Sequence, residues 1–357
     1  MTAPVRLPLE RLDIATARLR MHVRARGTGE TVLFVHGNAS SSAFWDETLE
    51  HLPGGWRGLA PDLRGYGDTE DLLIDATRGV MDWVDDLLAL LSTLEVRSYH
   101  IVGHSLGGAV CWGLVAADAA RIRSVTLVAP GSPYGFGGTR DAQGTPCWPD
   151  FAGSGGGTVN PEFARRIAAG ERDEVDANSP RSVMNTYYFK PPFRPEREED
   201  LLSSLLSERV GPERYPGDFV ASDNWPGVAP GVHGPINALS PKYAAAVAQA
   251  ALNTQPKPPV LWVRGDSDTI VSDNSLFDFG TLGQLGAIPG WPGAELYPPQ
   301  PMVTQTRSFL EEYAARGGEW REVVMEGVGH TPFVERPREF QALLHQHLET
   351  TRTKENA

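Results

Sequence analysis

A serine between two glycines is the first place in this chain where residue types and spacing point to chemistry. Residues 103–108 read GHSLGG, a G-x-S-x-G pattern centred on Ser105. An apolar run precedes the pattern and a helical pattern follows it, so the serine falls between a strand and a helix. A sharp turn there would lift the hydroxyl clear of the sheet, and side chains at 103 and 107 would collide with neighbouring elements. Ser105 is therefore predicted to be a nucleophile, although a plain strand-to-helix turn also uses two glycines.

A serine nucleophile needs a base, and one of the nine histidines is well placed for that role. His330 follows the last predicted strand, in MEGVGHTPFVERP, and precedes the final helix. His36 and His104 lie beside the predicted site but belong to backbone motifs. We therefore predict that His330 is the base.

The base needs an acid to orient it, and two aspartates compete for this role. Both follow the predicted strand in PVLWVRGDSDTIVS, at residues 259–272. Asp268 lies beyond the strand end, where a loop reaches across to an imidazole. Asp266 lies closer to the strand and suits the cap of a turn. We favour Asp268 and keep Asp266 as the alternative.

A tetrahedral intermediate also needs two backbone N–H donors. The helix that starts at Leu106 points its N-terminus at the site and supplies the first donor. The second is predicted at Asn38, because HGN at 36–38 follows a buried strand and its glycine allows close approach. Losing one such donor typically costs roughly 10²–10³ in rate. Asn38 as an ordinary polar turn residue is the alternative.

Alternating strands and helices must position these residues. Residues 11–26 alternate apolar and polar side chains and predict an antiparallel hairpin, and TVLFVHG is typical of a buried strand. Helical spacing marks residues 80–95, and strands and helices alternate again up to residue 130 and beyond residue 259. This order predicts an α/β fold with a mostly parallel central sheet and helices on both faces.

Two long segments interrupt the alternation. Residues 131–256 are rich in glycine, proline and aromatic residues, and we predict a cap inserted between the core parts 1–130 and 257–357. Residues 272–300 are predicted to form a rim loop, since a loop this long in a compact domain usually serves binding. A disordered excursion is the alternative for the rim, but its aromatic side chains would be costly to leave in water.

Composition narrows the set of partners. The chain is 41% hydrophobic and 22% charged, which is ordinary for a soluble protein, and its net charge of −13 argues against nucleic acid and anionic membranes. It contains no run near 18 apolar residues and starts without a signal-type apolar core, so we expect a cytoplasmic protein without a membrane span. Two cysteines show no metal or disulfide spacing, and we expect no metal and no cofactor. Nothing in the sequence indicates the oligomeric state.

Several stretches, in order, resemble the α/β-hydrolase superfamily. HGN at 36–38 resembles its oxyanion loop, DLRGYGDT at 62–69 the loop after its fourth strand, and GHSLGG its nucleophile elbow. RGDSDTIVS and GVGHTPFVERP resemble its acid and histidine segments, so the likeness covers about residues 10–130 and 257–350. The resemblance implies an α/β-hydrolase fold with the order serine, acid, histidine. Its roles would fall on Ser105, Asp268 and His330, with the N–H groups of Asn38 and Leu106 as the oxyanion hole.

The chain also departs from its relatives. In related dehalogenases and epoxide hydrolases the nucleophile is an aspartate, so Ser105 argues against both activities. Proline iminopeptidase relatives usually carry a GGSWG elbow, which differs from GHSLGG. The rim insertion lengthens the interval between Asp268 and His330, and it offers Asp273 and Asp278 as further candidates for the acid.

Aromatic residues of the cap and rim indicate a roofed, mainly apolar pocket. We expect hydrolysis of a carboxylic ester or lactone of a small to medium, fairly apolar substrate, with no nucleic-acid partner. The alternatives are the same triad acting on a carbon–carbon, amide or thioester bond, or a cofactor-free perhydrolase or ligand-binding member. Candidate substrate contacts, some of which would instead pack the cap on itself, are His104, Trp148, Tyr187, Tyr188, Trp225, His233 and Trp291.

Overall fold

The computed structural model describes residues 8–352 of the 357-residue chain. Eight strands form one sheet in the order β1-β2-β4-β3-β5-β6-β11-β12. The predicted hairpin, β1 with β2, is antiparallel, β2 is antiparallel to β4, and the other neighbours are parallel. The strands are β1 (Glu10–Ala15), β2 (Arg20–Gly27), β3 (Gly29–Val35), β4 (Gly55–Pro61), β5 (Tyr99–His104), β6 (Ile122–Val128), β11 (Val260–Gly265) and β12 (Trp320–Met325).

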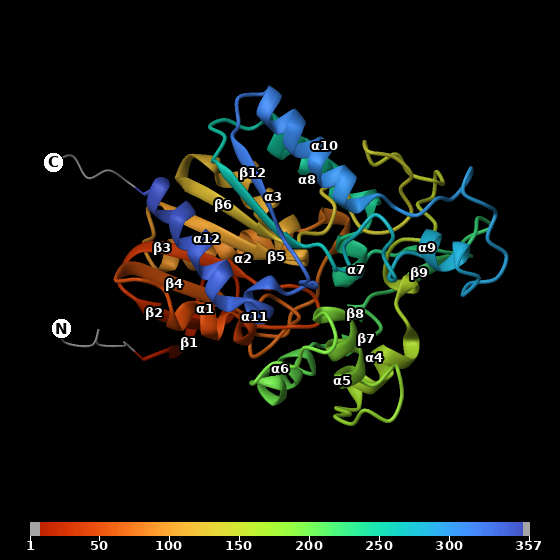
Figure 1. The fold of residues 1–357 in the computed structure, drawn as a ribbon, viewed down its shortest axis with the longest axis horizontal. Helices are drawn as coiled ribbons and strands as arrows, with labels where there is room; N and C mark the ends of the chain where they lie inside the picture. The colour runs from red at the N-terminus through yellow and green to blue at the C-terminus, as the bar shows by residue number, and fades with distance from the viewer. Residues whose placement is uncertain (1–7, 353–357) are drawn as a thin grey trace.

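Helices cover both faces of this sheet (Figure 1). Along β3, Leu33 and Val35 join one core cluster and Val32 and Phe34 join the other, because successive side chains of a strand point to opposite faces. The predicted α/β fold with helices on both faces is confirmed. The first cluster is completed by α2 (Met81–Thr93), α3 (Leu106–Asp118), α8 (Pro241–Asn253) and α10 (Met302–Ala315), the second by α1 (Asp46–Glu50), α11 (Pro332–Glu335) and α12 (Pro337–Thr350).

The parallel strands end at one edge of the sheet, and the predicted site residues lie directly beyond those ends. Ser105 follows β5, Asp268 comes three residues after β11, and His330 comes five residues after β12. HGN at 36–38 follows β3 in the same way. Residues far apart in the sequence are therefore brought to one place by the sheet itself. Short 3₁₀ turns η1 (Ser42–Trp45), η2 (Ala76–Arg78) and η3 (Ala119–Arg121) connect the core elements.

The part of the chain between β6 and α8, called the cap segment below, lies toward one end of the sheet, away from both chain termini (Figure 1). Its hydrophobic residues continue the second core cluster, so the segment is packed onto the core. Helix α8 falls within the predicted cap range but packs on α3 and joins the first core cluster. The other elements are η4 (Gly156–Thr158), α4 (Pro161–Ala168), α5 (Pro180–Val183), η5 (Met184–Tyr188), α6 (Glu198–Leu205), β7 (Val210–Gly211), β8 (Tyr215–Pro216), β9 (Phe219–Ala221), β10 (Val228–Pro230) and α7 (Pro235–Ala238).

The rim at 272–300 folds against this segment. It contains the short helix α9 (Phe279–Gln284), and the side chain of Tyr297 is buried. The indole of Trp291 donates to the carbonyl of Tyr297 at 2.9 Å, and the indole of Trp225 donates to the carbonyl of Pro289 at 2.9 Å. These contacts bury aromatic surface that a disordered excursion would expose.

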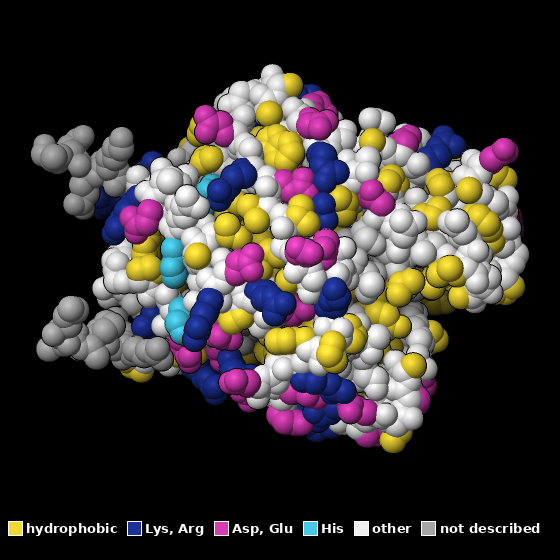
Figure 2. Space-filling model, in the orientation of Figure 1, with side chains coloured by type: hydrophobic (Ala, Val, Ile, Leu, Met, Phe, Trp, Pro, Cys, Tyr) yellow, Lys and Arg dark blue, Asp and Glu magenta, His cyan; other side chains and the backbone are white. Residues whose placement is uncertain are grey.

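The surface of this end of the molecule is rich in hydrophobic side chains, which gather near β9 and α9 in Figure 2. Phe219, Val220 and Leu285 are more than half exposed. Among residues 8–352, no helix combines the length and the apolar character needed to cross a bilayer.

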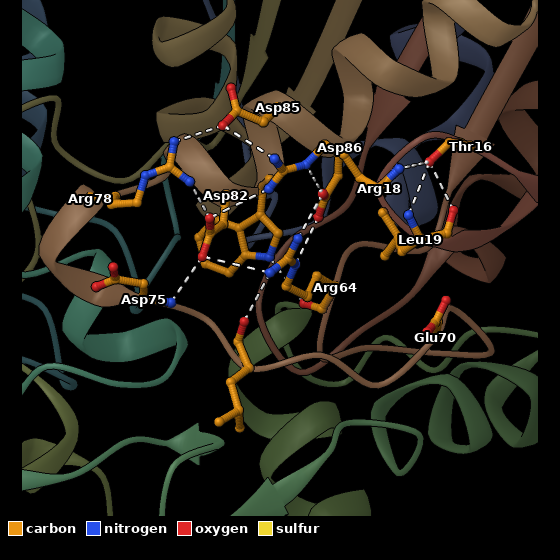
Figure 3. A network of polar contacts seen from close by, with 12 residues as sticks. Thr16, Arg18, Leu19, Arg64, Glu70, Asp75, Arg78, Asp82, Asp85 and Asp86 are labelled. Atoms are coloured by element: carbon orange, nitrogen blue, oxygen red, sulfur yellow. Dashed lines mark hydrogen bonds and ion pairs between the residues drawn. The ribbon is translucent and has the colours of Figure 1, made fainter.

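A buried ion-pair network fixes the loop after β4 (Figure 3). Arg64 donates from Nε and Nη2 to the two carboxylate oxygens of Asp86, each at 2.8 Å, and Arg18 donates to the same carboxylate at 2.6 Å. Asp86 is fully buried in α2 and Arg64 is 8% exposed. The paired geometry compensates the cost of burying these charges, so the network holds the loop in one position.

Removal of the Asp86 carboxylate should destabilise the protein strongly, because the buried Arg64 guanidinium loses its two hydrogen bonds to a carboxylate. We expect Asp86→Ala to cost about 3–5 kcal/mol of unfolding free energy, measured by urea denaturation. The matched control is Asp85→Ala, which removes a partly exposed partner of Arg78 and should cost less than about 1 kcal/mol. Equal losses in the two variants would contradict this role of Asp86.

Candidate active site

Ser105 lies in a strained turn between β5 and α3. Its backbone has φ 53° and ψ −115°, a left-handed conformation that is unfavourable for a residue with a side chain. Its N–H donates to the carbonyl of Val128 at 3.0 Å, and its own carbonyl accepts from Gly108 and Gly131. Ser105 is partly exposed although its neighbours His104 and Leu106 are buried. The turn therefore presents the hydroxyl at the carboxyl edge of the sheet.

The two glycines of the pattern are required by close approaches. A Cβ at Gly107 would lie 2.4 Å from the carbonyl oxygen of Val35, which belongs to the neighbouring strand. A Cβ at Gly103 would lie 2.4 Å from the Sγ of Cys111 and 2.4 Å from the Gly107 carbonyl oxygen. Larger residues would force the strand and the helix apart, so both glycines serve the turn at Ser105.

Asp268 and His330 form a buried hydrogen-bonded pair. The imidazole Nδ1 of His330 lies 2.8 Å from Oδ2 of Asp268. His330 is 3% exposed and Asp268 is 6% exposed. The other carboxylate oxygen accepts from the backbone N–H groups of Ile270 and Val271 at 2.8 and 2.9 Å. A carboxylate accepts a proton donor, so Nδ1 carries the hydrogen and Nε2 is left with its lone pair. This is the tautomer that a general base requires.

The other three candidate acids have different partners. Asp266 is exposed and accepts from Ser267 Oγ and Gly327 N–H, which hold its pKa below the usual value. Asp273 accepts from the N–H groups of Val303 and Thr304 at the start of α10. Asp278 accepts from the N–H groups of Thr281 and Gln300 and so ties the ends of the rim together. The geometry brings Asp268 to His330 and uses the other three elsewhere.

The peptide between Gly37 and Asn38 is held in one orientation beside Ser105. The Gly37 carbonyl oxygen accepts from the imidazole Nδ1 of His36 at 2.7 Å and from Ser40 Oγ at 2.9 Å. Carbonyl and N–H groups of a trans peptide point in opposite directions, so the Asn38 N–H faces away from His36. A Cβ on Gly37 would lie 3.1 Å from Cβ of Ser105, which places this peptide next to the serine.

His36 can hold the peptide because its tautomer is fixed. Its Nε2 accepts from the N–H of Leu63 at 3.0 Å, so the hydrogen is on Nδ1, the atom that faces Gly37. Burial lowers the pKa of His36 and keeps the ring neutral, although Asp62 acts in the opposite direction. His36 thus orients a predicted oxyanion donor, a role that the sequence alone did not reveal.

The Asn38 side chain is fixed by Tyr66, whose hydroxyl donates to Oδ1 of Asn38 at 2.8 Å. Tyr66 follows Arg64 closely in the chain, in the loop that the pair of Arg64 and Asp86 anchors. The N–H of Leu106, the other predicted donor, belongs to the first turn of α3, where N–H groups have no partner within the helix. Both predicted donors therefore border Ser105.

His104 supports the loop that carries His330. Its Nε2 lies 2.9 Å from the His330 carbonyl oxygen, and the two rings are 4.7 Å apart. Its ring also packs edge-on against Phe333, and the residue is 2% exposed. Burial holds the pKa of His104 well below its usual value, so the ring is neutral and Nε2 donates. These contacts favour support of the loop over contact with a substrate.

Glu208 is a buried acid that sequence reasoning missed. It is 5% exposed, and within residues 8–352 neither carboxylate oxygen has a hydrogen-bond partner. Burial raises its pKa well above the usual range, an effect that the nearby Tyr66 and the backbone of Ala39 only partly offset. The neutral carboxyl is therefore favoured beside the oxyanion loop. In the sequence, SLLSERV gives no sign of this burial, because glutamate normally lies on the surface.

The remaining candidate substrate contacts have mixed surroundings. The indole of Trp148 donates to the carbonyl of Trp225 at 2.7 Å within the cap segment, and the indole of Trp291 donates to the carbonyl of Tyr297 within the rim. The ring of Trp225 packs against Tyr297 and so joins the two segments. The ring of Tyr187 meets Phe277 edge-on at 5.1 Å. The backbone N–H of His233 donates to Asp218 at 2.7 Å. Tyr188 contacts two loops of the site, through its hydroxyl and through its carbonyl oxygen.

One group of possible metal ligands occurs in residues 8–352: His22, Asp62 and Asp68 bring three ligand atoms within 4.8 Å of one another. Its central carboxylate is already used, because Asp62 accepts from the N–H groups of Ser42 and Asp68. The group therefore serves the loop after β4.

A family model described as alpha/beta hydrolase fold matches residues 30–282. The chain belongs to the α/β-hydrolase fold family. An epoxide hydrolase from Caballeronia sordidicola is 26% identical over 309 residues, which are 82% of this chain and 87% of that protein. The predicted membership of this family, made from motifs at the strand ends, is confirmed.

Solved structures share the fold at low sequence identity. A thermophilic esterase from Thermogutta terrifontis superposes with a TM-score of 0.56 at 19% identity, over 96% of this chain and 100% of that one. An N-acyl homoserine lactonase superposes with a TM-score of 0.56 at 17% identity, over 98% of this chain and 100% of that one. At such identity these likenesses establish the fold alone.

Asp278 gives the rim a pH dependence. Burial raises its pKa from 3.8 to about 6, so the folded state binds this proton more tightly than the unfolded chain. The protonated Asp278 carboxyl therefore stabilises the folded state below pH 4. This contribution, up to about 3 kcal/mol of unfolding free energy, is lost as the pH rises through about 6. We expect Asp278→Asn to raise the urea midpoint at pH 8 more than at pH 4, because the amide carries no charge to bury at pH 8. Its oxygen can still accept from Thr281 and Gln300. An equal change at both pH values would contradict this assignment.

Proposed function

We propose that the protein is a serine hydrolase that cleaves a carboxylic ester or a lactone. The observation that carries the proposal is the buried 2.8 Å contact between His330 and Asp268, at the same edge of the sheet as a serine in a strained left-handed turn. Strain of this kind persists only where surrounding structure imposes it, and it clusters at functional sites. The chain belongs to the α/β-hydrolase fold family, and we assign the role of nucleophile to Ser105.

In the first half of the reaction Ser105 attacks the carbonyl carbon of the substrate. His330 accepts the hydroxyl proton at Nε2, and Asp268 stabilises the imidazolium that forms. The carbonyl oxygen becomes an oxyanion, which accepts from the N–H groups of Asn38 and Leu106. The intermediate then collapses, His330 gives its proton to the leaving alkoxide oxygen, and an acyl-enzyme ester remains on Ser105.

In the second half water takes the place of the serine. His330 accepts a proton from the water as it attacks the acyl carbon, and the same N–H groups hold the second oxyanion. Collapse releases the carboxylic acid and returns the proton to Ser105. With a lactone the alcohol stays attached to the acyl group, so one product, a hydroxy acid, leaves.

The cap segment and the rim support a small to medium, fairly apolar substrate. Aromatic side chains of the two segments pack on one another, Tyr187 on Phe277 and Trp225 on Phe279 and Tyr297. The net charge of −13 gives no support for a phosphorylated substrate.

Epoxide opening is the second candidate, because of the similarity to an epoxide hydrolase over 82% of the chain. Attack by an aspartate on an epoxide gives an ester, which water cleaves. Attack by Ser105 would give an ether, which has no carbonyl for the second oxyanion step and would not turn over. The serine therefore favours ester or lactone cleavage.

The identity of the nucleophile is tested by turnover of substrates by wild type and Ser105→Ala. We expect wild type to hydrolyse p-nitrophenyl butyrate or a member of a γ- and δ-lactone panel, and Ser105→Ala to lose at least about 10³-fold in kcat/KM. Styrene oxide should not be turned over. Equal activity of the two proteins would refute the proposal, and epoxide turnover that survives Ser105→Ala would favour the second candidate.

The acid is tested by Asp268→Asn. The amide oxygen would accept from Ile270 and Val271, and its NH₂ would then face Nδ1 of His330. His330 would take the tautomer with hydrogen on Nε2 and could not accept the serine proton, so kcat should fall by about 10⁴. The matched control, Asp266→Asn, lies at an exposed turn and should change kcat less than about threefold. A larger loss in the control than in Asp268→Asn would assign the acid differently.

A further inference from the structure

One residue of the inserted segment contacts both loops that carry the proposed machinery. Tyr188 ends η5, a single π-helical turn, and is 7% exposed. Its hydroxyl donates to the carbonyl oxygen of Ala39 at 3.0 Å. Its own carbonyl oxygen accepts from the N–H and Oγ1 of Thr331 at 3.0 and 2.7 Å. Ala39 follows the proposed donor Asn38, and Thr331 follows the proposed base His330, so Tyr188 bridges the two loops.

The backbone after Tyr188 runs alongside the histidine loop. One oxygen of Glu335 accepts from the N–H of Gly329 at 2.9 Å, and the other accepts from the N–H of Lys190 at 2.9 Å. A Cβ on Gly329 would lie 2.8 Å from the backbone nitrogen of Lys190, which shows how closely the two segments pack. The carboxylate of Glu335 therefore joins the cap segment to the loop of His330 by a second contact.

The loop that the Tyr188 hydroxyl holds is strained. Ala39 has φ 44°, a left-handed conformation that costs energy for a residue with a Cβ and needs support from its surroundings. Tyr188 supplies that support from the cap side, where its ring also packs 6.2 Å from Phe44. Tyr66 holds the same loop from the core side through Asn38. Loss of either hydroxyl would let the loop relax.

We propose that Tyr188 is a positioning residue, which sets the separation between the oxyanion loop and the loop of His330 and so makes the seated cap a condition for catalysis. The proposal rests on the proposed serine-hydrolase function. An oxyanion donor works only when it lies about 2.7–3.1 Å from the developing charge, so a small shift of the loop weakens it. The substrate itself need not touch Tyr188, which differs from the expectation that this side chain contacts substrate.

The test is Tyr188→Phe, which keeps the ring and the backbone carbonyl and removes the hydroxyl. We expect kcat for p-nitrophenyl butyrate to fall about 10–100-fold, less than for complete loss of a donor, with KM within about threefold of wild type. The inhibition constant of phenylboronic acid, whose serine adduct is a tetrahedral anion, should rise by the same factor as kcat falls. A side chain that merely bound substrate would change KM instead.

The matched control is Tyr313→Phe. This phenol also donates to a backbone carbonyl, that of Pro258 at 2.7 Å, and is fully buried, but it lies at the opposite end of β11. It should lose comparable stability in urea with unchanged kcat. A wild-type kcat in Tyr188→Phe, or an equal kcat loss in both variants, overturns the proposal.

Hydrogen exchange separates this proposal from the proposed function. Amides of residues 36–42 should exchange faster in Tyr188→Phe than in wild type and Tyr313→Phe, whether or not the ester is a substrate. If wild type hydrolyses no ester or lactone, the proposed function fails, and faster exchange still supports the bridge between the loops. Unchanged exchange overturns the bridge, even when wild type is active.

Discussion

The left-handed backbone at Ser105 is the constraint on which the site depends. A conformation of this kind costs about 1–3 kcal/mol, and here hydrogen bonds to β6 and to the turn after it hold it in place. The carbonyl oxygen of Val35 leaves no room for a side chain at Gly107, so β3 and α3 must pass close together. The same close approach brings the loop after β3 against the serine. The position of the proposed nucleophile and the position of the proposed oxyanion donor therefore have one physical cause.

The loops around Ser105 are fixed by groups that do not react. His36 orients the Gly37–Asn38 peptide, Tyr66 holds the Asn38 side chain, and the loop that carries Tyr66 is anchored by Arg64. The contacts of His36 and Arg64 are buried and that of Tyr66 is partly buried; a buried hydrogen bond is stronger than an exposed one and costly to leave unmade. Precise placement of donors is what oxyanion stabilisation requires, since the donors then need no rearrangement as charge develops.

The fold, and the placement of Ser105, Asp268 and His330 at one edge of the sheet, could be predicted because the sequence signals are local. Apolar runs mark the strands, and GHSLGG, GDSD and GVGH each stand just beyond a strand end, so a parallel sheet alone brings Ser105, Asp268 and His330 to one edge. Asp266 and Asp268 are separated by their place relative to the strand end, and the structure shows the same difference in their partners. The sequence contains no signal that α8 packs on α3, because the apolar face of this helix would suit a cap as well as the core.

The contacts of the cap segment could not be predicted. The hydroxyl of Tyr188 meets a residue 149 positions earlier and its carbonyl meets one 143 positions later. Pairings at such separations are set by how the segment packs as a whole, and aromatic side chains suit pocket walls, core and clamps alike. The burial of Glu208 could not be predicted either, because a glutamate within a polar stretch normally lies in solvent.

The most direct test of the central claim is covalent labelling with an aryl fluorophosphonate, followed by intact mass and peptide mapping. We expect one adduct per chain, on Ser105, and no adduct in Ser105→Ala. An unlabelled wild-type protein, or an adduct on another residue that persists in Ser105→Ala, would contradict the claim that Ser105 is the activated nucleophile.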